Sequence, residues 1–304
     1  MENALAEWVA RPAALLFSSG YAANVGALAA LCGPGDLLIS DRLNHASLVD
    51  GCRLSRADVA IVEHGDEDAI AHQFSQARDR PARWVVVESY YSMDGDSPNL
   101  GRLRELCDRH DAHLFVDEAH ALGVFGPSGS GLCRAVGVVP DVLVGTLGKS
   151  VGVAGAFVAG SELLRRWLWN RARTFVFSTA PSPMLTELLL RQLHATRAAS
   201  DARVCLRKNA DSLRQALVAA GVPIKPGNHG PIVPILVGDP ARCVRIAERL
   251  LAEGIVVQAI RPPTVPENTA RLRVTVTATM TPNDIERLAS ALVGALDIEH
   301  QPAC

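Results

Sequence analysis

Short apolar runs alternate with amphipathic stretches over the first 160 residues, and this alternation constrains the fold more than any other feature of the sequence. The runs are rich in the residues of buried strands, and they are DLLIS (36–40), DVAIVE (58–63), RWVVVES (83–89), HLFVDE (113–118), DVLVGT (141–146) and GAFVAG (155–160). Between them lie stretches such as 69–78 and 100–110, where apolar residues recur every three or four positions. Strands that alternate with helices form βα units, so the sequence predicts an α/β fold with a mainly parallel sheet.

The pattern changes after a long helical region at 182–221. Beyond it come the apolar runs PIVPILVG, IVVQAI and ARLRVTVTA with helical stretches between and after them, which predicts a smaller α+β domain. Its last helix has a clear start, because Thr281 is a good N-cap and Asp284 follows three residues later. We expect a large domain over 1–195 and a small C-terminal domain over 196–304.

Composition and charge favour small-molecule partners. A chain of 304 residues can bury one large core and a second, smaller one. Its 30 basic and 32 acidic residues form no long runs, so there is no charged footprint for nucleic acid or for a membrane surface. The apolar stretches are too short or too interrupted to span a bilayer, and MENALAEWVA lacks the features of a signal peptide. We expect a cytoplasmic protein.

Cysteine and histidine spacing predicts no metal site. The seven cysteines form no CxxC pair, and the nine histidines include no HExxH motif. Scattered cysteines of this kind are most often buried reduced thiols.

The chemically informative residues follow two predicted strands. Lys149 lies in the glycine-rich run GTLGKSVGVAG after one strand, and Asp117 ends another in LFVDEAH. A lysine can hold pyridoxal 5'-phosphate as a Schiff base, and a carboxylate can keep the pyridine nitrogen of that cofactor protonated. Ligands of open α/β sheets gather at the carboxyl ends of the strands, where Ser89 and Thr146 also fall. These residues predict a pyridoxal phosphate site.

Two other interpretations of Lys149 are weaker. A phosphate-binding P-loop needs a glycine five positions before the Gly148–Lys149 pair, and the chain has Leu143 there. A solvated loop lysine beside a capping aspartate is the default for an isolated pair. Several further polar positions argue against that default here.

Glycine, hydroxyl and imidazole side chains mark further candidate cofactor contacts. Gly20 and Tyr21 lie where a small-residue turn leads into a helix, whose first N–H groups would bind the phosphate. An ordinary βα turn is the alternative. Thr146 is a second candidate phosphate ligand, and Ser92 is a candidate donor to the cofactor. His120 would reach the hydroxyl side of the ring.

Three positions leave two interpretations open. His45, at a loop-to-helix junction, would either stack on the cofactor ring or cap the helix. Ser178 and Thr179 would either contact phosphate across a dimer interface or act as an N-cap. Arg271 and Arg273 lie on one face of a strand, and one of them would clamp a substrate carboxylate. We favour Arg273.

These motifs resemble those of the α-oxoamine synthases, pyridoxal phosphate enzymes of fold type I. The resemblance covers essentially the whole chain and rests on DRLNHASLVDG, YYSMDGDSPNL, LFVDEAHALGVFG, GTLGKSVGVAG and AIRPPTVPENTARLRVTVTA. These runs are most similar to members that condense alanine with a pimeloyl thioester, on coenzyme A or acyl carrier protein, in biotin biosynthesis. Sister members that use glycine or serine are the alternative.

The resemblance implies a role for each matched residue. It implies catalytic roles for Lys149, His45, Asp117 and His120. It implies further cofactor contacts at Gly20, Tyr21, Ser92 and Thr146, and substrate contacts at His45, Thr264 and Arg273. A homodimer is also implied. The family has a segment before the point where this chain begins, so we expect its acyl-binding arginine to be absent, and a non-catalytic relic is the competing interpretation.

Overall fold

The computed structural model describes residues 1–298. The chain forms two compact units. The first consists of Met1–Tyr91 and Ser97–Ser200, and the second consists of Ser92–Asp96 together with the chain from Asp201 onwards. The second unit therefore includes a short segment, Ser92–Asp96, that lies far from the rest of it in the sequence.

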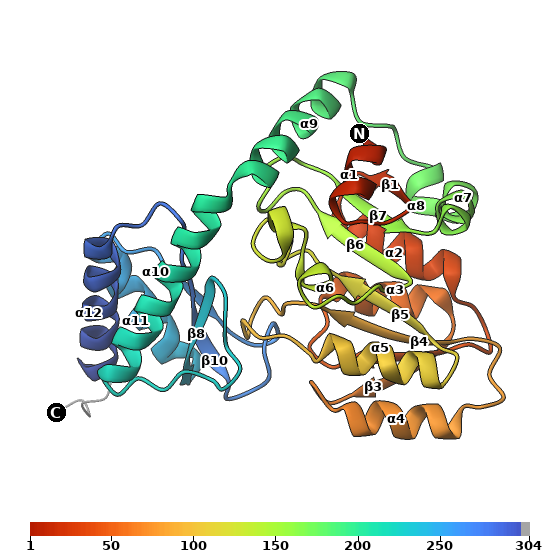
Figure 1. Ribbon diagram of the computed structural model, residues 1–304. Helices are drawn as coiled ribbons and strands as arrows, with labels where there is room; N and C mark the ends of the chain where they lie inside the picture. The colour runs from red at the N-terminus through yellow and green to blue at the C-terminus, as the bar shows by residue number, and fades with distance from the viewer. Residues whose placement is uncertain (299–304) are drawn as a thin grey trace. The chain divides into compact units, whose positions relative to one another are not determined.

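A seven-stranded sheet forms the centre of the first unit, with strand order β1-β7-β6-β5-β4-β2-β3 (Figure 1). The strands are β1 (Ala13–Phe17), β2 (Leu37–Asp41), β3 (Asp58–Val62), β4 (Arg83–Glu88), β5 (His113–Asp117), β6 (Val142–Thr146) and β7 (Ala156–Gly160). Strands β2 to β6 pair in parallel, whereas β7 is antiparallel to both β1 and β6. The predicted α/β fold with a mainly parallel sheet is confirmed.

The alternating direction of side chains along each strand produces two hydrophobic cores, one on each face of the sheet. On β4, Val85 and Val87 point into one core, whereas Trp84 and Val86 point into the other. Helices α4 (Glu67–Gln76) and α5 (Leu100–Arg109) cover the first face. Helices α2 (Gly20–Leu31) and α3 (Ala46–Ser55) cover the second. Burial on both faces explains why these strands are continuous apolar runs.

The remaining elements of the first unit connect or flank the sheet. They are α1 (Glu2–Trp8), the 3-10 helix η1 (Pro127–Gly129), α6 (Leu132–Ala135), α7 (Glu162–Arg171), α8 (Arg173–Val176) and α9 (Pro183–Ala198).

The second unit contains a three-stranded antiparallel sheet of order β8-β10-β9. Its elements are α10 (Ser200–Ala219), β8 (Ile232–Gly238), α11 (Pro240–Ala252), β9 (Gln258–Ile260), β10 (Ala270–Thr275) and α12 (Pro282–Ile298). The helices share one core with the sheet. The predicted start of α12 is confirmed, since Thr281 N–H donates to Asp284 at 2.8 Å and Asp284 N–H donates to the Thr281 hydroxyl at 3.2 Å.

Two further observations concern residues 1–298 as a whole. None of the helices there combines the length and apolar character needed to cross a bilayer. Over the same residues, no group of three or more His, Cys, Asp or Glu side chains is placed to hold a metal ion.

Candidate active site

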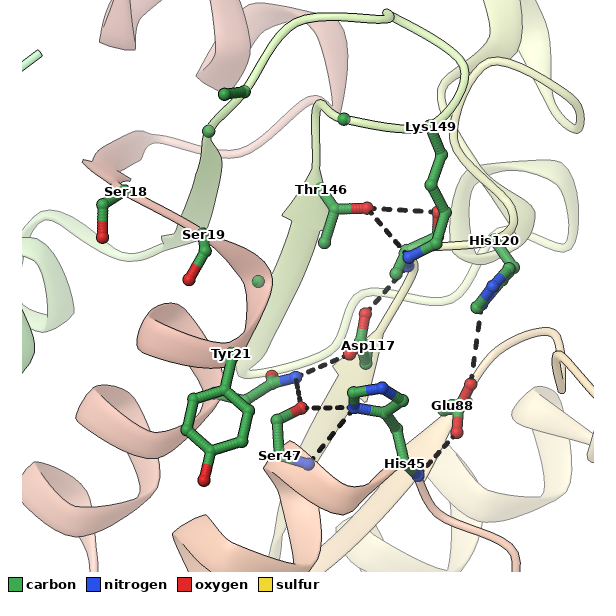
Figure 2. Close-up of a pocket in the computed structure, with 16 residues that line it drawn as sticks. Ser18, Ser19, Tyr21, His45, Ser47, Glu88, Asp117, His120, Thr146 and Lys149 are labelled. Atoms are coloured by element: carbon green, nitrogen blue, oxygen red, sulfur yellow. Dashed lines mark hydrogen bonds and ion pairs between the residues drawn. The ribbon is translucent and has the colours of Figure 1, made fainter. Parts of the chain in front are cut away.

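A cavity of about 300 Å³ opens in the first unit at the carboxyl ends of β4, β5 and β6 (Figure 2). Its volume suits a small cofactor. It brings together seven of the residues predicted from sequence, namely Gly20, Tyr21, His45, Asp117, His120, Thr146 and Lys149. These residues come from four separate stretches of the chain, and the fold places them around one space.

Asp117 is the last residue of β5 and is only 4% exposed. Its Oδ1 accepts a hydrogen bond from Ala119 N–H at 2.8 Å. Its Oδ2 accepts one from the Asn24 amide at 2.7 Å. A buried carboxyl group held by two donors has a fixed orientation, and its remaining lone pairs can accept from a ligand in the cavity.

Lys149 lies in the loop after β6, and its side chain points back to the end of that strand (Figure 2). Its Nζ lies 3.4 Å from the hydroxyl of Thr146. That hydroxyl also donates to the Ala119 carbonyl at 3.3 Å. Thr146 therefore ties the lysine amine to the loop that follows Asp117.

Glu88 lines the cavity together with two histidines and is 2% exposed. Its Oε1 accepts from His45 N–H at 2.8 Å, and its Oε2 lies 3.8 Å from Nδ1 of His120. Burial raises the pKa of Glu88 well above its ordinary value, and the nearby Asp117 carboxylate raises it further. This environment favours the protonated form of Glu88.

Helix α2 directs its N-terminus at the cavity. Ser19 is its N-cap, and the Ser19 hydroxyl accepts from Ala22 N–H at 3.1 Å. A Cβ atom on Gly20 would overlap Cγ2 of Thr146, so glycine is what allows the helix and β6 to approach. The first N–H groups of the helix are thus available to an anion in the cavity.

Tyr21 and His45 reach the cavity from the starts of two helices. Tyr21 is half exposed, and its hydroxyl donates to Asp50 at 2.7 Å. His45 is the N-cap of α3, and its Nδ1 accepts from Ser47 N–H at 3.2 Å. His45 therefore caps the helix as well as bordering the cavity, so the two interpretations of this residue are compatible.

Ser178 and Thr179 lie outside this cavity. They border a second cavity of the first unit, of about 770 Å³, and Ser18 lines both cavities. The interpretation of Ser178 or Thr179 as an N-cap was wrong, because α9 is capped by Ser182, whose hydroxyl accepts from Leu185 N–H at 3.2 Å. The cap lies later because α9 begins only at Pro183, with proline in its first turn.

Ser92, Thr264 and Arg273 belong to the second unit. The Arg273 Nε donates to the Ser92 carbonyl at 2.6 Å, and its Nη1 lies 3.2 Å from the Gln258 side chain. Thr264 is exposed in the loop before β10, and its N–H donates to the Arg261 carbonyl at 3.0 Å.

The two arginines of β10 have different surroundings. Arg271 is buried, and its Nη1 pairs with Asp94 at 2.9 Å while its Nε donates to the Thr269 carbonyl at 3.1 Å. Lys225 pairs with the same Asp94 oxygen at 2.9 Å. Arg271 is therefore engaged in holding the Ser92–Asp96 segment, whereas the guanidinium of Arg273 is partly exposed.

Three buried polar residues of the cavity were not predicted from sequence, and they are Asn24, Ser47 and Glu88. Asn24 interrupts a run of small and apolar residues in α2, and Glu88 ends the apolar strand WVVVE. A polar residue inside a buried segment is the signal that would have identified both. Ser47 has no comparable signal, because serine is common in the first turn of a helix.

The chain is similar to several known proteins. The family model for aminotransferase class I and II matches residues 1–292. A putative 8-amino-7-oxononanoate synthase of Bacillus licheniformis is 42% identical over 288 residues, which cover 95% of this chain and 76% of the relative. The 8-amino-7-oxononanoate synthase of Alkalilimnicola ehrlichii is 45% identical over 295 residues, which cover 96% and 75%.

Solved structures show the same relationship. A serine palmitoyltransferase from S. paucimobilis, with bound PLP-myriocin aldimine, superposes with a TM-score of 0.94 at 30% identity, covering 98% of this chain and 76% of that one. An 8-amino-7-oxononanoate synthase from Francisella tularensis superposes with a TM-score of 0.87 at 26% identity, covering 99% and 87%.

Proposed function

Because this chain belongs to the aminotransferase class I and II family, we propose that it is a pyridoxal-phosphate-dependent acyltransferase. Its reaction condenses L-alanine with a pimeloyl thioester, on coenzyme A or acyl carrier protein, and releases carbon dioxide. The product is 8-amino-7-oxononanoate, an intermediate of biotin biosynthesis. The observation that carries the proposal is the placement of Lys149 and Asp117 on one cavity, in a chain 45% identical to a relative of that name.

The lining of the cavity fits this cofactor in three respects. The buried carboxyl group of Asp117, oriented by Asn24 and Ala119, is suited to a protonated pyridine nitrogen. The amine of Lys149 is suited to the aldehyde. The N-terminus of α2 is suited to the phosphate, because its first residue, Gly20, has no side chain and no space for one beside Thr146.

When bound, pyridoxal phosphate supplies an electron sink for the bond-breaking steps at the amino-acid α-carbon. Asp117 would maintain the proton on the pyridine nitrogen, on which that capacity depends. Lys149 would hold the cofactor covalently, and its freed Nζ would then remove the α-proton of alanine. His120 would donate to the ring hydroxyl, and His45 would lie against the ring face. Gly20, Tyr21 and Thr146 would make phosphate and cofactor contacts, and Ser92 would be a further donor to the cofactor.

Substrate binding is assigned to the second unit. Arg273 would bind the alanine carboxylate, since two parallel N–H donors match a carboxylate and since the guanidinium of Arg271 is already paired with Asp94. Thr264, exposed in the loop before β10, would contact the substrate.

We also propose a cytoplasmic homodimer. In it, Ser178 and Thr179 of one subunit would contact the phosphate of the cofactor bound to the other subunit. In support, exposed apolar side chains flank these residues in the sequence, with Phe177 74% and Met184 84% exposed. Sedimentation of the wild type and of Phe177→Asp tests this assignment. A dimer that dissociates in the variant is the expected result, and a monomeric wild type would contradict it.

A substrate assay tests the proposed reaction. The purified protein, loaded with pyridoxal phosphate, is incubated with pimeloyl-CoA or pimeloyl-acyl carrier protein and with alanine, glycine or serine labelled in the carboxyl carbon. Labelled carbon dioxide and 8-amino-7-oxononanoate should appear chiefly with alanine. A preference for glycine or serine would assign the chain to a sister activity, and no release with any amino acid would identify a non-catalytic protein.

A further inference from the structure

A continuous chain of hydrogen bonds joins Asp117 to the imidazole of His45 through two residues of the cavity (Figure 2). Asn24 Nδ2 lies 2.7 Å from Oδ2 of Asp117 and 2.9 Å from Oγ of Ser47. Oγ of Ser47 lies 2.8 Å from Nδ1 of His45. Asn24 and Ser47 are each only 1% exposed, so water does not compete for these bonds.

The hydrogens of this chain can be assigned by counting donors at Asn24. A side-chain amide carries two N–H groups, and here the two nearest acceptors are Oδ2 of Asp117 and Oγ of Ser47. The opposite amide orientation would place Oδ1 against the carboxylate oxygen. The Asn24 Oδ1 is buried and has no hydrogen-bond partner in the described part of the chain. Both amide hydrogens are therefore used inside the chain.

The backbone of Ser47 determines the direction of the next bond. The Ser47 backbone N–H donates to Nδ1 of His45 at 3.2 Å, so this nitrogen presents a lone pair. The Ser47 oxygen accepts from Asn24, and its one hydroxyl hydrogen is then free to donate to the same Nδ1 at 2.8 Å. Because Nδ1 accepts, the ring proton is on Nε2.

We propose that Asn24 and Ser47 are positioning residues that hold His45 as the neutral Nε2–H tautomer and tie that tautomer to the orientation of the Asp117 carboxyl group. The catalytic meaning of this inference rests on the proposed function. A cationic His45 beside the cofactor ring would oppose protonation of the pyridine nitrogen by charge repulsion. By holding His45 neutral, the hydrogen-bond chain would leave the positive charge on the pyridine nitrogen that pairs with Asp117.

The ionisable groups around His45 are compatible with this arrangement. Glu88, from β4, accepts the backbone N–H of His45 at 2.8 Å rather than a ring N–H. Asp117, from β5, reaches His45 only through Asn24 and Ser47. His120 and Lys149 line the same cavity. Nδ1 of His45 is contacted by the backbone N–H and the hydroxyl of Ser47.

The test is the tautomer of His45 in the cofactor-free protein, read from imidazole nitrogen NMR signals after ¹⁵N-histidine labelling. The His45→Gln spectrum assigns the signals. The wild type should show a bare Nδ1 and a protonated Nε2, and Ser47→Ala should shift the ring towards a mixture of tautomers. Ser55→Ala is the matched control, because Ser55 is a buried serine of the same helix that bonds to the Cys52 carbonyl. It should leave His45 unchanged.

Kinetics give a second readout. In the loaded enzyme, Ser47→Ala and Asn24→Ala should each lower kcat on the order of tenfold, with little change in KM for alanine, because hydrogen bonds to charged or polarised groups contribute at this level. A protonated Nδ1 in the wild type would overturn the inference even if a variant fails to fold. So would a Ser47→Ala protein with an unchanged tautomer. A shifted tautomer in a protein without any condensation activity would instead count against the proposed function alone.

Discussion

Glu88 and Asp117 are register partners at the ends of the parallel strands β4 and β5, so two buried carboxyl groups on neighbouring strands line the same cavity. Burial raises the pKa of Glu88 well above its ordinary value, with Asp117 as the second cause. Two carboxyl groups on neighbouring strands repel each other when both are charged, which disfavours the ionisation of both at once. We infer that Glu88 holds a proton.

If Glu88 is protonated, two substitutions of it should affect cofactor affinity to different extents. Glu88→Gln is neutral and keeps an oxygen for the His45 N–H, so its affinity for pyridoxal phosphate should stay within about threefold of the wild type. Glu88→Ala leaves that N–H without an acceptor, and its affinity should fall on the order of tenfold. Titration of the visible cofactor absorbance measures both. Equal losses in the two variants would mean that the charge of Glu88 matters.

Asp117→Asn should separate cofactor attachment from turnover. The amide keeps a side chain of the same shape beside Asn24 but cannot stabilise a pyridinium charge. We expect kcat to fall on the order of 10²-fold or more, since a preorganised electrostatic stabiliser is lost. Cofactor content per chain should stay near that of the wild type. Near-normal turnover in this variant would contradict the role given to Asp117.

Loss of Arg271 should lower stability, whereas loss of Arg273 should weaken alanine binding. Arg271→Ala leaves the buried Asp94 with Lys225 alone, and the free energy of unfolding should fall by about 3 kcal/mol. Arg273→Ala should fold normally but raise KM for alanine on the order of tenfold or more. Chemical denaturation and steady-state kinetics of the two variants provide the comparison, and the reverse pattern would assign the carboxylate to Arg271.

Glu118 predicts a pH dependence of stability that is separate from catalysis. Burial raises the pKa of Glu118 from 4.5 to about 7, although its Oε1 accepts from Cys133 N–H at 2.7 Å. Between pH 4.5 and about pH 7, Glu118 keeps its proton in the folded chain but has lost it in the unfolded chain. The free energy of unfolding therefore decreases as pH rises through this window, by on the order of 3 kcal/mol in total.

The variant Glu118→Gln should remove this pH dependence, because the amide cannot titrate. Urea denaturation at pH 5 and pH 8 measures the effect in the wild type and the variant. The wild type should lose more stability than the variant between the two pH values. The same change in both proteins would show that Glu118 is not the titrating group.

The sequence predicted the ends of the strands better than it predicted their order. Asp117 and Thr146 were placed correctly at the carboxyl ends of two strands, because an apolar run that stops at a polar residue is a local signal. The antiparallel insertion of β7 between β1 and β6 has no local signal. It depends on pairing between residues such as Leu16 and Phe157, which are far apart in the chain.

The polar network of the site was predicted only in part. Lys149 and Asp117 belong to motifs, but Asn24 and Ser47 become recognisable only when the fold places them between Asp117 and His45. Their side chains bond to residues up to 93 positions away, as for Asn24 and Asp117. Such long-range contacts are set by tertiary packing and cannot be read from spacing.

The attachment site of the cofactor tests the central claim most directly. The chain has three lysines, Lys149, Lys208 and Lys225, and of these Lys149 lines the cavity. The protein is loaded with pyridoxal phosphate, reduced with borohydride and digested, and the modified peptides are identified by mass spectrometry. We predict a pyridoxyl group on Lys149 at close to one per chain, with none on Lys208 or Lys225 and none after Lys149→Arg. An unmodified Lys149, or equal labelling of all three lysines, would contradict the account.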